Sequence, residues 1–133
     1  MLQEEGLDNV FARHKRHAAA TRAAVRHWGL EILCQREDEH SPILTAVLMP
    51  DGHDADRFRD VVLQNYDMSL GAGLSKVKGR VFRIGHLGHF NDLMLMGTLS
   101  GVEMGLAMAN VPHKSGGVLA AMAVLTGKEA PAA

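Results

Sequence analysis

Gly79-Arg80-Val81-Phe82-Arg83-Ile84-Gly85-His86-Leu87-Gly88 is the stretch of this chain with the sharpest pattern. Its hydrophobic residues predict a β-strand over residues 80–86, because β-branched and aromatic side chains favour a pleated, half-buried surface. Successive side chains of a strand point to opposite faces. Arg83 is therefore expected on the face opposite Phe82 and Ile84.

Two interpretations of Arg83 are open on spacing alone. An arginine between hydrophobic neighbours is either exposed to solvent or placed to bind an anion, since its planar guanidinium matches a carboxylate bidentately. Gly85 and Gly88 lack side chains, which permits the close approach of a ligand or of another backbone. The pattern alone leaves both interpretations standing.

The remaining sequence predicts four helices and three further strands. Residues 7–28 form an amphipathic pattern of helical period, and Gly29 follows as the terminating residue. The other predicted elements are strands at 30–34 and 43–49, a helix at 51–66, a strand at 68–70, and helices at 91–110 and 116–126. This order predicts an α+β fold, a small mixed or antiparallel sheet of about four strands with helices packed on one face.

Three glycines recur every fourth residue in the predicted helix 91–110, at Gly97, Gly101 and Gly105. Glycine costs about 1 kcal/mol relative to alanine inside a helix. We therefore expect another backbone to approach along this stripe, from the first helix, the sheet or a partner domain. Ser115 is the expected N-cap of the last helix.

Composition excludes several classes of function. The chain has 133 residues, which suits one domain, and 14 basic residues nearly balance 15 acidic ones. This balance gives no electrostatic reason to expect nucleic acid or an anionic membrane as a partner. Glu103 lies within the most apolar long stretch, 93–111, and a charge there opposes a membrane span. Cys34 is the single cysteine and cannot form an intrachain disulfide. Without a recognisable leader, the expected location is the cytoplasm.

Histidines could suggest a metal site. His86 and His89 stand three residues apart, with His53 and His113 elsewhere in the chain. No acidic residue completes a set at ligand spacing, so no metal site is predicted.

A resemblance to a known protein family, which extends over longer stretches of the sequence, bears on the choice between the two interpretations of Arg83. Arg83-Ile84-Gly85-His86-Leu87-Gly88, preceded by Gly71-Ala72-Gly73-Leu74, resembles the C-terminal signature of class V pyridoxal-phosphate-dependent aminotransferases. The resemblance is narrowest to the serine–glyoxylate and alanine–glyoxylate (serine–pyruvate) aminotransferases. It continues, in the same order, through residues 4–14, 91–93, 97–106 and 111–117. It implies that residues 1–133 are a single domain, the C-terminal small domain of such an enzyme, and a piece of a longer protein.

The resemblance also implies residue roles. Arg83 would bind the α-carboxylate of the amino-acid or 2-oxo-acid substrate, and Gly85 and His86 would form part of the wall of the site. Pyridoxal phosphate would be bound in the complete enzyme by a large domain that lies outside these residues. No lysine of this chain falls in the family's lysine segment; the five are Lys15, Lys76, Lys78, Lys114 and Lys128. This chain alone is therefore expected to supply no catalytic residue, to bind no cofactor and to be inactive.

The resulting hypothesis is a domain of a transaminase that moves an amino group from serine or alanine to glyoxylate or a similar 2-oxo acid. The alternative is a stand-alone α+β module that binds small carboxylates or only self-associates, without catalysis. The expected partners are the substrate, the large domain and further copies of the chain in a homo-oligomer. Met94, Leu99 and Met108 are the expected residues of a self-associating face.

Overall fold

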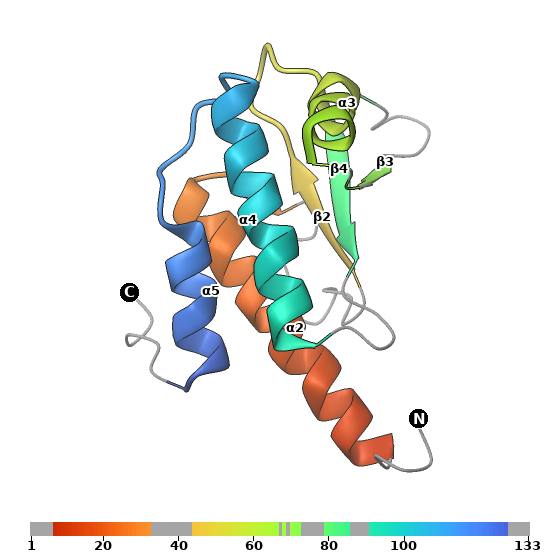
Figure 1. Cartoon of the computed structure of the whole chain (residues 1–133), viewed down its shortest axis with the longest axis vertical. Coiled ribbons are helices and arrows are strands. Elements are labelled where there is room, and N and C mark those ends of the chain that lie inside the picture. Colours follow the sequence, from red (N-terminus) through yellow and green to blue (C-terminus); the bar gives the residue numbers. More distant parts are fainter. Residues whose placement is uncertain are drawn as a thin grey trace.

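A computed structural model describes residues 7–32, 44–66, 68, 70–72, 79–85 and 91–127. The elements follow the predicted order, helix, two strands, helix, two strands, two helices (Figure 1). Their bounds are α2 (Leu7–Trp28), β1 (Glu31–Ile32), β2 (Leu44–Leu48), α3 (Ala55–Tyr66), β3 (Gly71–Ala72), β4 (Val81–Gly85), α4 (Asp92–Met108) and α5 (Gly117–Leu125).

The four strands form one antiparallel sheet in the order β1-β2-β4-β3. β4 is a central strand, and β2 lies beside it with Val47 opposite Phe82 and Ala46 opposite Arg83. On its other side β4 pairs with the two-residue edge strand β3. The predicted α+β class and the four-stranded sheet are confirmed.

One face of the sheet carries the hydrophobic core. Ile32, Val47, Phe82 and Ile84 are buried and belong to one cluster with residues of all four helices. The rings of Phe58 on α3 and Phe82 on β4 lie 4.8 Å apart between centroids, tilted by 47°. Ring pairs in this range add stabilisation beyond their buried area.

The opposite face of the sheet is less uniformly buried, with Val81 buried and its neighbours more exposed. Ala46, Leu48 and Arg83 are only half-buried, and Glu31 is exposed. Arg83 therefore lies on the face opposite Phe82 and Ile84, as the alternation of the strand predicts.

The C-terminal helix α5 packs along α2, with α4 against both (Figure 1). Trp28, the last residue of α2, is buried beneath the first turn of α5, where a side chain on Gly117 would overlap the indole. The indole Nε1–H donates to the Glu103 Oε1 on α4 at 2.7 Å. These contacts join the ends of three helices at one point.

The predicted start of α3 is four residues too early. Residues 50–53 instead form a turn, in which the His53 N–H donates to the Pro50 carbonyl at 3.2 Å. Asp54 then accepts the Asp56 N–H on its side chain at 2.9 Å, and the helix begins at Ala55. A side chain that satisfies a free N–H of the first turn defines a helix start more strongly than apolar periodicity does.

Two further predictions are wrong. In the strand expected at 68–70, Met68 and Leu70 are not in a strand, Ser69 lies outside the described residues, and β3 begins at Gly71. The Leu70 carbonyl accepts from the Arg59 side chain at 2.8 Å instead of from a neighbouring strand. The N-cap of α5 is Gly116, with φ of 105°, rather than Ser115. A carboxylate from another helix, Glu103, accepts the free N–H groups there, so a serine cap is not needed.

The glycine stripe of α4 is partly as expected. Gly105 and Gly101 do allow close packing, but the neighbours are side chains of α3 and of Met68 rather than a backbone. Gly97 is exposed, and a Cβ added to it would have nothing within 4 Å, so the expectation fails there. Within the described ranges, none of the helices combines the length and apolarity needed to cross a bilayer.

Candidate functional site

Arg83 occupies the middle of β4, between β2 and β3, on the face of the sheet away from the helix core. Its Nε–H is buried and has no hydrogen-bond partner among the described residues. A buried hydrogen-bond donor without a partner destabilises a protein by about 1–3 kcal/mol. Nearly all buried donors in folded proteins therefore have a partner. This geometry suits a cationic fork that is completed by a bound anion.

Gly71 on β3 lies directly opposite Arg83 in the sheet. A Cβ on Gly71 would come within 3.1 Å of both the Arg83 Cβ and its Nε, and within 3.6 Å of Cζ. The arginine side chain therefore lies across the bare backbone of the edge strand. In the sequence, the Gly71-Ala72-Gly73 run stands out only as part of a family signature, and nothing there indicates a role for Gly71 itself.

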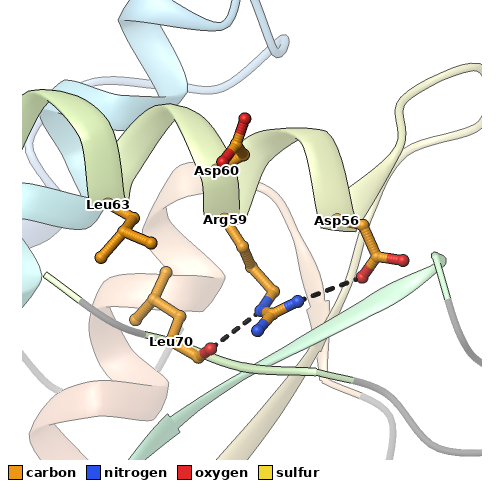
Figure 2. A pocket seen from close by; sticks show the side chains of 5 residues that line it. All are labelled: Asp56, Arg59, Asp60, Leu63 and Leu70. Carbon is orange, nitrogen blue, oxygen red and sulfur yellow. Dashed lines mark hydrogen bonds and ion pairs between the residues drawn. The ribbon is translucent and has the colours of Figure 1, made fainter.

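A small cavity of about 130 Å³ lies behind this edge strand, between α3 and the segment that enters β3 (Figure 2). Arg59 crosses it, donating through Nε to the Leu70 carbonyl at 2.8 Å and through Nη1 to Asp56 Oδ1 at 3.3 Å. Asp60 and Leu63 complete its walls. Arg59 is thus engaged by its own chain and acts as a brace between α3 and β3.

The other predicted site residues are less defined. Gly85 is the last residue of β4, opposite Leu44 of β2, while His86 lies outside the described residues. The position of Gly85, two residues along the strand from Arg83, is compatible with a common wall.

The described residues do not fit pyridoxal phosphate. Lys15 on α2 and Lys114 before α5 are both exposed, and neither lies near Arg83 in the sheet. Lys76, Lys78 and Lys128 lie outside the described residues. The described part of the chain therefore offers no buried lysine for a Schiff base.

Metal-ligating side chains do not gather in the described part of the chain, where no group of three or more His, Cys, Asp or Glu residues could hold an ion. His53 is half-buried in the turn before α3. His113 donates through Nδ1 to the Val111 carbonyl at 2.7 Å, a local turn contact. His86 and His89 lie outside the described residues.

An ion pair joins α2 to the start of α4, and no sequence pattern indicates it. The Asp92 carboxylate accepts from the Arg16 guanidinium at 2.9 and 3.1 Å and from His17 Nε2 at 2.8 Å. Partial burial acts to raise the pKa of Asp92, but these hydrogen bonds and the Arg16 charge outweigh it and hold that pKa below its ordinary value. His17 is fully buried. The cluster has a structural role in fixing how α2 and α4 pack.

Known proteins are similar to this chain in both sequence and fold. No family model matches the sequence. The chain is 48% identical over 121 residues to a serine–glyoxylate aminotransferase of Arabidopsis thaliana, covering 91% of this chain and 30% of that protein. It is 44% identical over 117 residues to an L-aspartate–glyoxylate aminotransferase of Paracoccus denitrificans, covering 88% and 30%. The chain thus spans about 30% of the length of these relatives.

Solved structures agree. The ureidoglycine–glyoxylate aminotransferase of Bacillus subtilis superposes with a TM-score of 0.87 at 28% identity, over 94% of this chain and 33% of that one. The pyridoxamine–pyruvate aminotransferase of Mesorhizobium loti also gives a TM-score of 0.87, at 30% identity, over 94% and 32%. Sequence and fold therefore point the same way, and this chain matches the C-terminal part of the class V aminotransferases.

Proposed function

We propose that this chain is the C-terminal small domain of a pyridoxal-phosphate-dependent aminotransferase that moves an amino group from serine or alanine to glyoxylate or a similar 2-oxo acid. The observation that carries the proposal is the buried Nε–H of Arg83 in the middle of β4, which has no hydrogen-bond partner within the part of the chain that the structure describes. Homology to aminotransferases supplies the reaction class.

The relatives agree more closely on the amino acceptor than on the amino donor. Several relatives are named for glyoxylate, whereas the amino donors in their names differ among serine, L-aspartate and ureidoglycine. Glyoxylate is therefore the first acceptor to assay. Serine is the first donor, because the relative with 48% identity is named for it.

Arg83 is proposed to bind the carboxylate of both substrates. An amino acid and a 2-oxo acid each carry a carboxylate next to the carbon that reacts, so one fixed guanidinium can orient both. Two of its five N–H groups can donate in parallel to the two carboxylate oxygens, and charged hydrogen bonds of this kind are about twice as strong as neutral ones. Gly85 and His86 are proposed to form the adjoining wall.

The remaining parts of the site are proposed to come from a large domain outside these 133 residues, which would hold the cofactor and the lysine. This chain alone is then expected to retain no pyridoxal phosphate and to catalyse no transamination. Dialysis after mixing the two should leave no visible absorbance on the protein. A stoichiometric band that survives dialysis and disappears on replacing one lysine would overturn this part of the proposal.

Replacement of Arg83 in the complete enzyme tests the proposed role. Arg83→Lys keeps the charge but loses the planar fork, and Arg83→Ala loses both. The loss of one hydrogen bond to a charged group corresponds to a fall of about 10- to 150-fold in kcat/KM for serine. Cofactor binding should be unchanged.

Ethanolamine, which is serine without its carboxylate, provides the internal control. We expect ethanolamine to react slowly, at the same rate in the wild type and in both variants, because it has no carboxylate to contact Arg83. Unchanged kcat/KM for serine in Arg83→Ala would contradict the proposal. So would an equal loss with serine and ethanolamine, which would mark Arg83 as a folding residue.

A further inference from the structure

The edge of the sheet beside Arg83 contains a feature that the proposed function does not use. Gly71 on β3 faces Arg83, and a Cβ there would lie 3.1 Å from the arginine Nε and 3.6 Å from Cζ. Both atoms belong to the part of the side chain that directs the guanidinium. The contact with Cζ would be an ordinary one, but Nε is too close, so a side chain at position 71 would require Nε or the edge strand to shift.

Backbone conformation does not explain the glycine. The glycines of this chain with φ in the left-handed region are, among the described residues, Gly29, Gly52, Gly79, Gly116 and Gly127, and Gly71 is not one of them. An L-residue could therefore adopt the backbone angles at position 71 without strain. What the glycine supplies at this position is space for the Arg83 side chain.

The backbone that borders Arg83 is fixed from the helix side. β3 has only two residues and lies at the edge of the sheet, so its own ladder with β4 is short. The residue before it, Leu70, is buried, and its carbonyl accepts the Arg59 Nε–H at 2.8 Å (Figure 2). Asp56 accepts from Arg59 Nη1 at 3.3 Å and holds the guanidinium in line. A series of contacts therefore runs from α3 through Leu70 and Gly71 to Arg83.

We propose that Gly71 is a positioning residue for the carboxylate-binding arginine, and that Arg59 holds it in place through Leu70. The proposal rests on the proposed function of Arg83 and extends it. Bidentate binding of a carboxylate depends on the direction of the guanidinium plane. A methyl group at position 71 would press on the Arg83 Nε, and we expect this to change the direction of the guanidinium plane.

Gly71→Ala in the complete enzyme is the test, with Gly97→Ala as the matched control. Gly97 is exposed on α4 and has nothing within 4 Å of an added Cβ. Misplacement by about 1 Å can cost roughly 100-fold in rate, and the displacement here is smaller. We expect kcat/KM for serine and for glyoxylate to fall about tenfold in Gly71→Ala. Gly97→Ala should match the wild type, and ethanolamine should react equally well with all three.

The Arg83→Lys background separates positioning from a general loss of structure. Lysine has no planar fork to tilt, so Gly71→Ala should have little further effect there. If the two changes multiply fully, Gly71 acts on something other than Arg83 and the proposal is overturned. If Arg83→Ala leaves kcat/KM for serine unchanged, the proposed role of Arg83 fails, and this inference fails with it.

Arg59→Lys provides a second test of the proposal, because it changes the support of the edge strand without adding volume beside Arg83. The positive charge stays, but the Nε–H donated to Leu70 is lost. The fall in kcat/KM should have the same carboxylate dependence as in Gly71→Ala and should also shrink in the Arg83→Lys background. Wild-type kinetics in Arg59→Lys would remove Arg59 from the proposal. Should Gly71→Ala not fold, this variant still decides whether the edge strand acts through Arg83.

Discussion

Glu103 shows how one side chain can join several elements. Its carboxylate accepts from the Trp28 indole at 2.7 Å and from the N–H groups of Val118 at 3.2 Å and Gly116 at 3.3 Å. The negative charge also lies at the positive end of α5, where the helix dipole favours it. Partial burial acts to raise the pKa of Glu103, but the hydrogen bonds from Trp28 and from the start of α5 outweigh it and leave that pKa below its ordinary value of 4.5.

This lowered pKa predicts a pH dependence of stability. A carboxyl whose pKa is lower in the folded state contributes stability above its unfolded pKa and loses it as the pH falls through the folded value. The free energy of unfolding should therefore decrease below about pH 4.5, the ordinary value for Glu103. Glu103→Gln should reduce that free energy by about 1.5–3 kcal/mol near neutral pH and should flatten its acid dependence.

Urea unfolding of wild type and variant across this pH range measures both effects. Glu31→Gln is the matched control, because Glu31 is exposed on β1, and it should change stability by less than about 0.5 kcal/mol. Equal acid dependence in wild type and Glu103→Gln would show that the ionised Glu103 carboxylate contributes nothing to holding α5.

At the scale of elements, α4 presents two glycines in opposite environments. Gly97 is exposed and open, whereas a Cβ on Gly105 would lie 2.5 Å from Val62 Cγ2 and 3.1 Å from Phe58 Cε1 on α3. Gly97→Ala should stabilise the fold by about 0.5–1 kcal/mol through helix propensity. Gly105→Ala should destabilise it by about 1–3 kcal/mol through overpacking. Denaturant midpoints that rise for both variants would mean that α3 does not pack on α4 as described.

Structural features that depend on residues close together in the sequence can be predicted well from it. The end of α2 at Trp28 follows from Gly29, whose φ of 84° suits the position after a helix. The face of β4 on which Arg83 lies follows from alternation alone. The order of the elements follows from local periodicity, because it needs no knowledge of which surfaces meet.

Features set by distant residues are not predictable in this way. The strand at Gly71–Ala72 has no strand-forming side chains and exists because β4 pairs with it. The cap of α5 comes from Glu103 on a different helix, which no local motif around Ser115 could reveal. The role proposed for Gly71 depends on its register with Arg83, so only the folded sheet brings it to notice.

At the scale of the whole molecule, exposed apolar side chains gather on the outer helices. Leu93 is 81% exposed, Met94 49% and Met108 51% on α4, and Leu119 is 67% exposed on α5. Leu99, expected on the same face, is instead fully buried in the core, because it falls on the opposite side of α4. Leu99 therefore cannot contribute to the proposed self-associating face, and we propose Leu93 for that position.

Exposed apolar clusters of this kind promote association. We expect the isolated chain to form dimers or larger species, which light scattering would detect. A Leu93→Glu, Met94→Glu double variant should shift the population towards monomer. Leu63→Glu, on α3 and 47% exposed in the wild type, should not. A monodisperse monomer for the unaltered chain at high concentration would contradict this expectation.

Arg83 is proposed to hold the substrate carboxylate, and a crystal structure of the complete enzyme with glyoxylate bound would show whether it does. We expect two parallel hydrogen bonds from the Arg83 guanidinium to the carboxylate, each about 2.7–2.9 Å long. The Arg83 side chain should remain against the bare backbone of Gly71. A carboxylate bound by other groups, with Arg83 turned to solvent, would contradict the account.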